Sequence, residues 1–144
     1  KILFLDIALA QSLLGLDAVS WLLAPEKHLI NNGAIAEAFV GQEILAYSPP
    51  DQKAELYYWH KEERSSNAEV DFLIQKQGQI QPVEVKSGAV GILKSLSLFL
   101  KTHPQSNAGI RLYGGNYSFY NNIYSYPLYA VAGMLENNKE ILIP

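Results

Sequence analysis

The 144-residue chain is 49% hydrophobic and 17% charged, a composition typical of a folded domain that excludes intrinsic disorder as its main state. It contains no cysteine, which excludes disulfide frameworks, thiolate metal sites and a thiol nucleophile and indicates a reducing cytoplasm. A net charge of -3 argues against strong nonspecific binding of nucleic acid, no apolar run is long enough to span a membrane, and the first residue, Lys1, suggests a piece of a longer protein.

The N-terminal part of the chain carries a helical pattern. Apolar residues recur at helical spacing over residues 7–16, and Asp6 stands where an N-cap would, so a helix is expected there. The short apolar run 1–5 before it fits a strand, and residues 20–23 fit another turn of helix. We therefore expect residues 1–32 to form a lead-in of one strand and helices.

A further helix is expected directly after this lead-in. The sequence Asn31-Asn32-Gly33 predicts a break, and the apolar spacing that follows predicts a helix over residues 34–47, which Pro49-Pro50 ends. This helix carries Glu37. We expect it to open the main domain, which would run over residues 33–144.

The rest of the chain has a pattern rich in strands. Alternating apolar and polar residues bounded by turn residues predict strands, and one apolar stripe at helical spacing predicts a helix. The elements are expected in this order: strands over residues 55–60, 68–75 and 80–86, a helix over 90–101, strands over 110–113 and 117–120, and an apolar helical tail over 128–135. The expected fold class is α/β, with a core of helix, three-stranded antiparallel meander, helix and strand.

The last two strands of the meander form a hairpin whose register follows from its turn. With an even number of turn residues, Asp71 lies opposite Glu84 and Glu69 lies opposite Lys86. A slip of one residue would set a charge on the apolar face, so the even turn is preferred. The apolar side chains that this register gathers on one face are Val70, Phe72, Val83 and Val85.

The polar face of this hairpin brings two carboxylates together. Like charges directly opposite each other destabilise a sheet unless a cation or a raised pKa relieves them. Asp71 and Glu84 together suit Mg²⁺, and Lys86 projects on the same side, where it can orient or activate a water or hold a developing negative charge. The alternative is that these residues, with Glu69, form only the solvated face of a half-buried hairpin, and the pattern leaves both interpretations open.

The acidic residues and the lysine also form a motif. Asp71, followed after twelve residues by Glu84-Val85-Lys86, resembles the D…(D/E)-x-K signature of the PD-(D/E)XK, or restriction-endonuclease-like, nuclease superfamily. More narrowly, several blocks in chain order resemble the C-terminal domain of unknown function that a family of prokaryotic AAA+ ATPases carries. The blocks are Phe4-Leu5-Asp6-Ile7-Ala8-Leu9, Glu37-Ala38-Phe39-Val40, Tyr58-Trp59, Ala68-Glu69-Val70-Asp71-Phe72, Val83-Glu84-Val85-Lys86-Ser87-Gly88 and Tyr126-Pro127-Leu128. Ala8 departs from the usual glycine of that family.

The resemblance implies a set of roles for these residues. Asp71 and Glu84 would hold Mg²⁺ or Mn²⁺ together with the backbone carbonyl of Val85. Glu37 on the preceding helix would support the metal site, and Lys86 would assist the attacking water. The implied activity is metal-dependent hydrolysis of DNA phosphodiester bonds.

The resemblance also implies partners. The chain would be the C-terminal domain of a larger ATPase, and its first partner would be the ATPase part of the same protein, with DNA as the expected substrate. No G-x-x-x-x-G-K-[ST] sequence occurs in the chain, so it is not expected to bind a nucleotide through a P-loop. The alternative function is a catalytically inactive module with a nuclease-like fold that serves the ATPase through protein contacts.

Two other groups of residues receive a structural interpretation. His28, His60 and His103 have no partner at metal-ligand spacing, so they are expected to be surface or capping residues rather than zinc ligands. Six of the nine tyrosines fall between Tyr113 and Tyr129, where no lysine or arginine accompanies them. Cross-strand aromatic packing or a protein interface is therefore favoured over stacking on nucleic-acid bases.

Overall fold

The computed structural model describes residues 6–13, 15, 29–51, 53–63, 66–76, 78–88 and 91–136. The helices are α1 Ile7–Leu13, α3 Leu29–Ala46, α4 Lys94–Thr102 and α5 Val131–Glu136, with a 3₁₀ turn η2 at Leu128–Ala130. The strands are β1 Tyr57–Glu63, β2 Ser66–Lys76, β3 Gln79–Lys86, β4 Gly109–Tyr113, β5 Ser118–Tyr120 and β6 Ile123–Pro127. The predicted order of helix, three-strand meander, helix and strand is confirmed by α3, β1 to β3, α4 and β4, so the protein is a mixed α/β fold.

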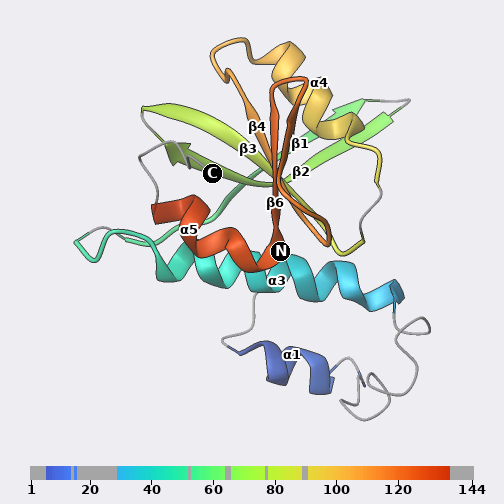
Figure 1. Ribbon diagram of the computed structural model, residues 1–144, viewed down its shortest axis with the longest axis vertical. Helices are drawn as coiled ribbons and strands as arrows, with labels where there is room; N and C mark the ends of the chain where they lie inside the picture. The colour runs from blue at the N-terminus through green and yellow to red at the C-terminus, as the bar shows by residue number, and fades with distance from the viewer. Residues whose placement is uncertain are drawn as a thin grey trace.

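The six strands form one sheet in the order β1-β2-β3-β4-β6-β5. The meander β1 to β3 is antiparallel, β4 pairs in parallel with both β3 and β6, and β5 closes the far edge antiparallel to β6. Helices α3 and α5 lie on one side of this sheet and α4 lies on the other (Figure 1). We call these two sides the α3 face and the α4 face.

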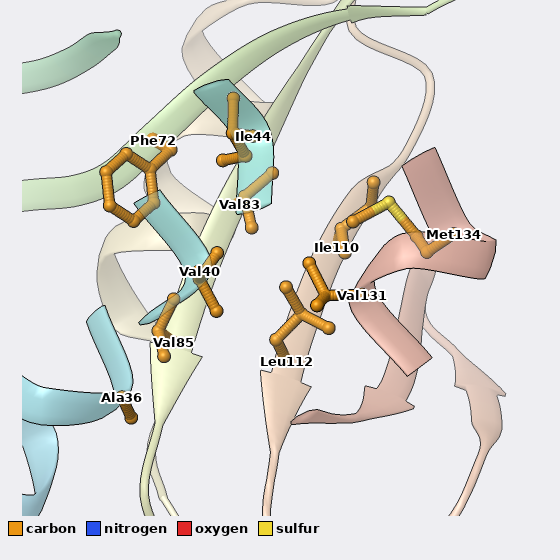
Figure 2. Packing of buried hydrophobic residues seen from close by; sticks show 10 residues of the cluster. All are labelled: Ala36, Val40, Ile44, Phe72, Val83, Val85, Ile110, Leu112, Val131 and Met134. Carbon is orange, nitrogen blue, oxygen red and sulfur yellow. The ribbon is translucent and has the colours of Figure 1, made fainter. Parts of the chain in front are cut away.

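The α3 face holds the larger hydrophobic cluster. Side chains from α3 and α5 pack against those of β2, β3 and β4, as Figure 2 shows. The cluster consists of Ala36, Val40, Ile44, Phe72, Val83, Val85, Ile110, Leu112, Val131 and Met134. Burial of this apolar surface is the main force that fixes α3 against β3 and β4.

The α4 face holds a second cluster, in which Leu96 and Phe99 of α4 pack on Val70 and Ile123. The helix approaches the sheet closely, because a Cβ atom at position 109 would lie 3.0 Å from Cδ1 of Leu96. These buried residues occupy the inward positions that the sequence predicts for this helix.

The N-terminal helix α1 begins where it is predicted. Oδ1 of Asp6 accepts a hydrogen bond from the backbone N–H of Ala8 at 2.6 Å, so Asp6 is its N-cap. The predicted strand 1–5 and the helical turn 20–23 lie outside the described residues. No helix in the described part of the chain is long and apolar enough to cross a membrane.

The predicted break at Asn31-Asn32-Gly33 is wrong, because α3 runs through it from Leu29. Asparagine and glycine cost only about 1 kcal/mol or less each in a helix interior. The burial of Val40 and Ile44 along the same helix outweighs that cost. The expected domain boundary between residues 32 and 33 therefore falls inside α3.

Strand β6 has no counterpart among the predicted elements. It alternates buried Ile123, Ser125 and Pro127 with half-buried Tyr124 and Tyr126. Its tyrosines meet rings of the preceding segment: the ring centroids of Phe119 and Tyr124 lie 4.4 Å apart, and those of Tyr117 and Tyr126 lie 5.2 Å apart. The predicted cross-strand aromatic packing is confirmed.

Candidate functional site

The hairpin of β2 and β3 has the predicted register over only part of its length. Its pairs run from Lys76–Gln79, across a turn that contains Gly78, to Phe72–Val83. The even turn is thus confirmed. Beyond Phe72–Val83 the ladder between the two strands ends, and β2 continues beside β1 while β3 continues beside β4. We call the gap between the two strands beyond Phe72 and Val83 the fork.

A bulge in β2 accompanies the fork. Tyr57 of β1 pairs with Leu73 and Trp59 pairs with Val70, so β2 contains one extra residue at this point. As a result Val70 lies in the cluster of the α4 face, whereas Phe72 lies in that of the α3 face. The prediction that Val70 shares a face with Phe72, Val83 and Val85 is therefore wrong for Val70, because the bulge interrupts the alternation of the strand.

Asp71 stands at the bulge, and its side chain is turned into the fork. It is 8% exposed, and its Oδ2 accepts a hydrogen bond from the backbone N–H of Val85 at 2.8 Å. The carboxylate thus replaces the main-chain carbonyl that a continued ladder would supply to Val85. The expected register of Asp71 opposite Glu84 is not continued by backbone pairing, but the two carboxylates flank the same gap.

Glu84 and Lys86 form an ion pair on the other side of the fork. Oε1 of Glu84 lies 2.7 Å from Nζ of Lys86, and Glu84 is 6% exposed, with Oε2 also buried. The expected register of Glu69 opposite Lys86 does not form, because the ladder between β2 and β3 ends at Phe72–Val83. Glu69 is exposed.

Three of the predicted catalytic residues, Glu84, Asp71 and Glu37, act on the pKa of the fourth, Lys86. Burial by itself lowers the pKa of Lys86, but the hydrogen bond with Glu84 and the negative charges of Glu84, Asp71 and Glu37 outweigh it, so that the pKa lies above its usual value of 10.5. Glu37 acts on Lys86 from α3, where it is half-buried. Lys86 is therefore a cation at neutral pH, surrounded by three carboxylates.

The donor set at the fork suits a small hard cation. Mg²⁺ prefers oxygen ligands and is commonly held by one or two carboxylates together with water. Asp71, Glu84 and the carbonyl of Val85 offer such oxygens. Within the described residues no group of three or more His, Asp or Glu side chains is arranged to hold a metal, so an ion here would take two carboxylates, main-chain oxygen and water.

His60 and His103 lie outside this site. His103 is the C-cap residue of α4 and stacks on Phe99 with ring centroids 4.1 Å apart. His60 is exposed, with Nδ1 3.7 Å from an oxygen of Glu62. The surface and capping roles expected of these two are confirmed, and His28 lies outside the described residues.

One charged residue of the site is not among the predicted ones. Arg111 lies opposite Glu84 in the register of the parallel strands β3 and β4. The signal is the alternation of Gly109–Tyr113, which sets Arg111 and Tyr113 on the face opposite to Ile110 and Leu112. That signal gains meaning only when β4 is known to lie beside β3.

Comparison with known protein families identifies the chain. The family described as Domain of unknown function (DUF4143) matches residues 32–131, well over half of the chain. No curated protein and no solved structure matches it. The matched range covers α3 from its fourth residue, the six strands of the described sheet and α4, and therefore every residue of the fork. The chain belongs to this family of domains of unknown function.

Proposed function

We propose that the chain is a metal-dependent phosphodiesterase domain of the restriction-endonuclease-like type, which hydrolyses DNA at the fork. The observation that carries this proposal is the position of Asp71. Its carboxylate bonds to the backbone of Val85, the middle residue of Glu84-Val85-Lys86, although the ladder between the two strands has ended. A purely solvated hairpin face would leave these acids in water, whereas both are more than 90% buried.

The side chains of the fork divide the chemistry between them. In the reaction a water oxygen forms a new bond to phosphorus, an ester P–O bond breaks, one proton leaves the water and one proton reaches the departing oxygen. A bound Mg²⁺ would supply Lewis-acid polarisation of the phosphate and of the water. Asp71 and Glu84 supply the negative charge that holds the ion. Lys86, a cation next to both, stabilises negative charge that develops on the phosphate oxygens.

Glu37 is a positioning residue in this proposal. It lies on α3, and its charge helps keep Lys86 protonated. Removing it would lower the pKa of Lys86 without removing an oxygen from the two carboxylates in the fork. We therefore expect Glu37→Gln to shift the alkaline limb of a pH–rate profile to lower pH, and to lower the rate at neutral pH less than Asp71→Asn does.

The wider context of the proposal comes from the sequence blocks. We propose that the domain stands at the C-terminal end of an AAA+ ATPase, that it binds no nucleotide itself, and that it works in the cytoplasm. With a net charge of -3 the chain attracts DNA weakly, so other parts of the protein would deliver the substrate.

The test is cleavage of labelled DNA with Mg²⁺ or Mn²⁺. We expect cleavage by the unmodified chain and a loss of roughly 10²- to 10³-fold in Lys86→Ala, the range seen when one charge-stabilising donor is removed. Lys53→Ala is the matched control, because Lys53 is 86% exposed and lines the same groove as Gly78, at the turn end of the hairpin. No cleavage beyond that of Lys86→Ala would overturn the proposal.

Metal binding gives a readout without turnover. Calorimetric titration with Mn²⁺ should show one site in the unmodified chain and none in Asp71→Asn. Equal heats in both proteins would contradict the assignment of Asp71 as a metal ligand.

A second candidate function, a catalytically inactive module that binds protein, is supported by the aromatic edge of the sheet. Phe119 and Tyr120 of the edge strand β5 are 53% and 76% exposed, and Tyr129 of η2 is 84% exposed. No charged residue occurs from Leu112 to Leu135. If this function is correct, Tyr120→Ser with Tyr129→Ser will abolish binding to the ATPase part, and Lys86→Ala will change nothing.

A further inference from the structure

Arg111 extends the candidate site across the neighbouring strand. In the parallel pairing of β3 and β4, Arg111 lies beside Glu84 and Tyr113 lies beside Lys86. Since Ile110 and Leu112 point into the cluster of the α3 face, Arg111 and Tyr113 lie on the α4 face. Glu84 and Lys86 share that face, because Val83 and Val85 belong to the same cluster as Ile110.

The guanidinium group of Arg111 is held on two sides. Its Nε donates a hydrogen bond to Oγ of the buried Ser125 at 3.1 Å, and its Cζ lies 3.7 Å from the ring centroid of Tyr113. The ring is fixed in turn, because the hydroxyl of Tyr113 donates a hydrogen bond to the carbonyl of Asn116 at 2.6 Å. Holding a long side chain in this way removes much of the entropy cost that binding a ligand would otherwise carry.

Gly115 adds a packing constraint to the same ring. A Cβ atom at position 115 would overlap Cε2 and Cζ of Tyr113, closer than side-chain atoms can approach. Only glycine lets the chain pass this close to the ring. We call Arg111, Tyr113, Gly115 and Ser125 the arginine platform.

The arginine platform presents N–H donors that no other described residue accepts. A guanidinium carries five N–H donors, and the bond to Ser125 takes only the one on Nε. Within the described part of the chain, Arg111 forms no ion pair, although a glutamate lies directly beside it on β3, and it is only half-buried. The terminal nitrogens of arginine match two oxygens of a phosphate group.

We propose that Arg111 is a substrate-binding residue that donates paired hydrogen bonds to a second phosphate of the DNA strand, adjacent to the phosphate hydrolysed at the fork. This inference rests on the proposed function and deepens it, because Arg111 lies one strand away from the fork, on β4, where it would contact a neighbouring phosphate of the same polynucleotide. The contact explains why a half-buried arginine is held in place although no acidic residue in the described ranges forms an ion pair with it.

The test compares two substrates in Arg111→Gln. Bis(p-nitrophenyl) phosphate has a single phosphodiester and reaches only the fork, whereas a DNA oligonucleotide reaches both places. We expect KM for DNA to rise about tenfold or more, the size of a lost charge-assisted contact, and kinetics on bis(p-nitrophenyl) phosphate to stay unchanged. The slope of log Kd for DNA against log salt should fall by about 1. Lys53→Gln, which also removes one positive charge, should show neither effect.

Other outcomes overturn the inference. Equal changes on both substrates would make Arg111 part of the fork chemistry or of the fold, and no change on DNA would remove it from the binding surface. If Arg111→Gln does not fold, Arg111→Lys keeps the charge and loses the paired geometry, and it must still raise KM for DNA alone.

Failure of the proposed function is a separate result. If the unmodified chain cleaves neither substrate, fluorescence anisotropy with a labelled oligonucleotide and no metal decides the matter. Weaker binding and a smaller salt slope in Arg111→Gln would support the phosphate contact, whereas equal binding, or no binding by the unmodified chain, would overturn it.

Discussion

The two halves of the β2–β3 hairpin differ in how they satisfy the backbone. From Lys76–Gln79 to Phe72–Val83 the strands bond to each other, and Phe72 and Val83 pack in the core. Beyond that point a side chain, Asp71, takes over a backbone bond, and two buried carboxylates, Asp71 and Glu84, stand beside the buried Val70 and Val85. The paired half therefore stabilises the fold, and the fork holds the groups that can perform chemistry.

Phe72 provides the strongest test of the paired half. Its ring is 2% exposed in the main cluster, so Phe72→Ala should lower the free energy of unfolding by about 3–5 kcal/mol. Urea denaturation measures this change. Phe72→Leu, which keeps most of the volume, should lose clearly less, and a loss below about 1 kcal/mol in Phe72→Ala would show that the ring is not packed as described.

At Asp71, which precedes Phe72, the loss of stability should depend on whether the substituted side chain keeps a hydrogen-bond acceptor, not on how much volume it loses. Asp71→Ala leaves the buried N–H of Val85 without its acceptor and should lower the free energy of unfolding by about 1–3 kcal/mol. Asp71→Asn keeps an acceptor oxygen and removes a negative charge from the fork, so it should lose less. Equal losses in the two variants would contradict the role of Asp71 as acceptor for Val85.

The turn of the paired half should show a smaller effect. Gly78 has φ 76°, in the left-handed region, so Gly78→Ala should lower the free energy of unfolding by about 1 kcal/mol. Asparagine adopts this conformation more readily, and Gly78→Asn should be closer to the unmodified chain. Thermal unfolding of both variants checks the order, and a neutral Gly78→Ala would contradict it.

The smallest expected effects are opposite pKa shifts of the two lysines of the hairpin, Lys76 and Lys86. Lys76, whose Nζ lies 2.6 Å from the carbonyl oxygen of Met134, has a pKa lowered by burial from its usual value of 10.5. Carboxylates and the hydrogen bond with Glu84 overcome burial to raise the pKa of Lys86 above 10.5. NMR titration of the lysine side chains should therefore find Lys76 titrating before Lys86 as pH rises, and the reverse order would contradict these environments.

The opposite pKa shifts of Lys86 and Lys76 should also give opposite changes in the free energy of unfolding as pH rises. The folded state favours the charged form of Lys86, so this stabilisation is present below pH 10.5 and is lost as pH rises through the raised pKa. Burial disfavours the charged form of Lys76, so that penalty is present below its lowered pKa and disappears as pH rises through 10.5. Relative to Lys86→Met the unmodified chain should lose stability at alkaline pH, and relative to Lys76→Met it should gain.

The paired half was predictable from local chemistry. The alternation of apolar residues and the short turn around Gly78 define the register, and the pairs down to Phe72–Val83 confirm it. The carboxylates of Glu84, Asp71 and Glu37 all act on the charge of Lys86. Much of this follows from the hairpin, because Glu84 and Lys86 lie on β3 and Asp71 lies on its hairpin partner.

The fork itself was not predictable from the hairpin alone. The bulge depends on how β2 pairs with β1, a contact whose register no turn chemistry near Asp71 defines. Strand β6 was missed for a similar reason, since its pairing with β4 is parallel and its tyrosines gave no strong apolar alternation. The start of α3 was missed because the low helix propensity of Asn31, Asn32 and Gly33 costs less free energy than the packing of the helix gains.

The hydrogen bond from Val85 to Asp71 makes the amide of Val85 a reporter of what the fork contains. This N–H bonds to a carboxylate, not to a neighbouring strand, so any cation or ligand that draws on Asp71 changes the shielding of its proton and its protection from exchange with solvent. One backbone resonance in an NMR spectrum can thus follow loading of the site without a substrate, a label on the side chain or turnover.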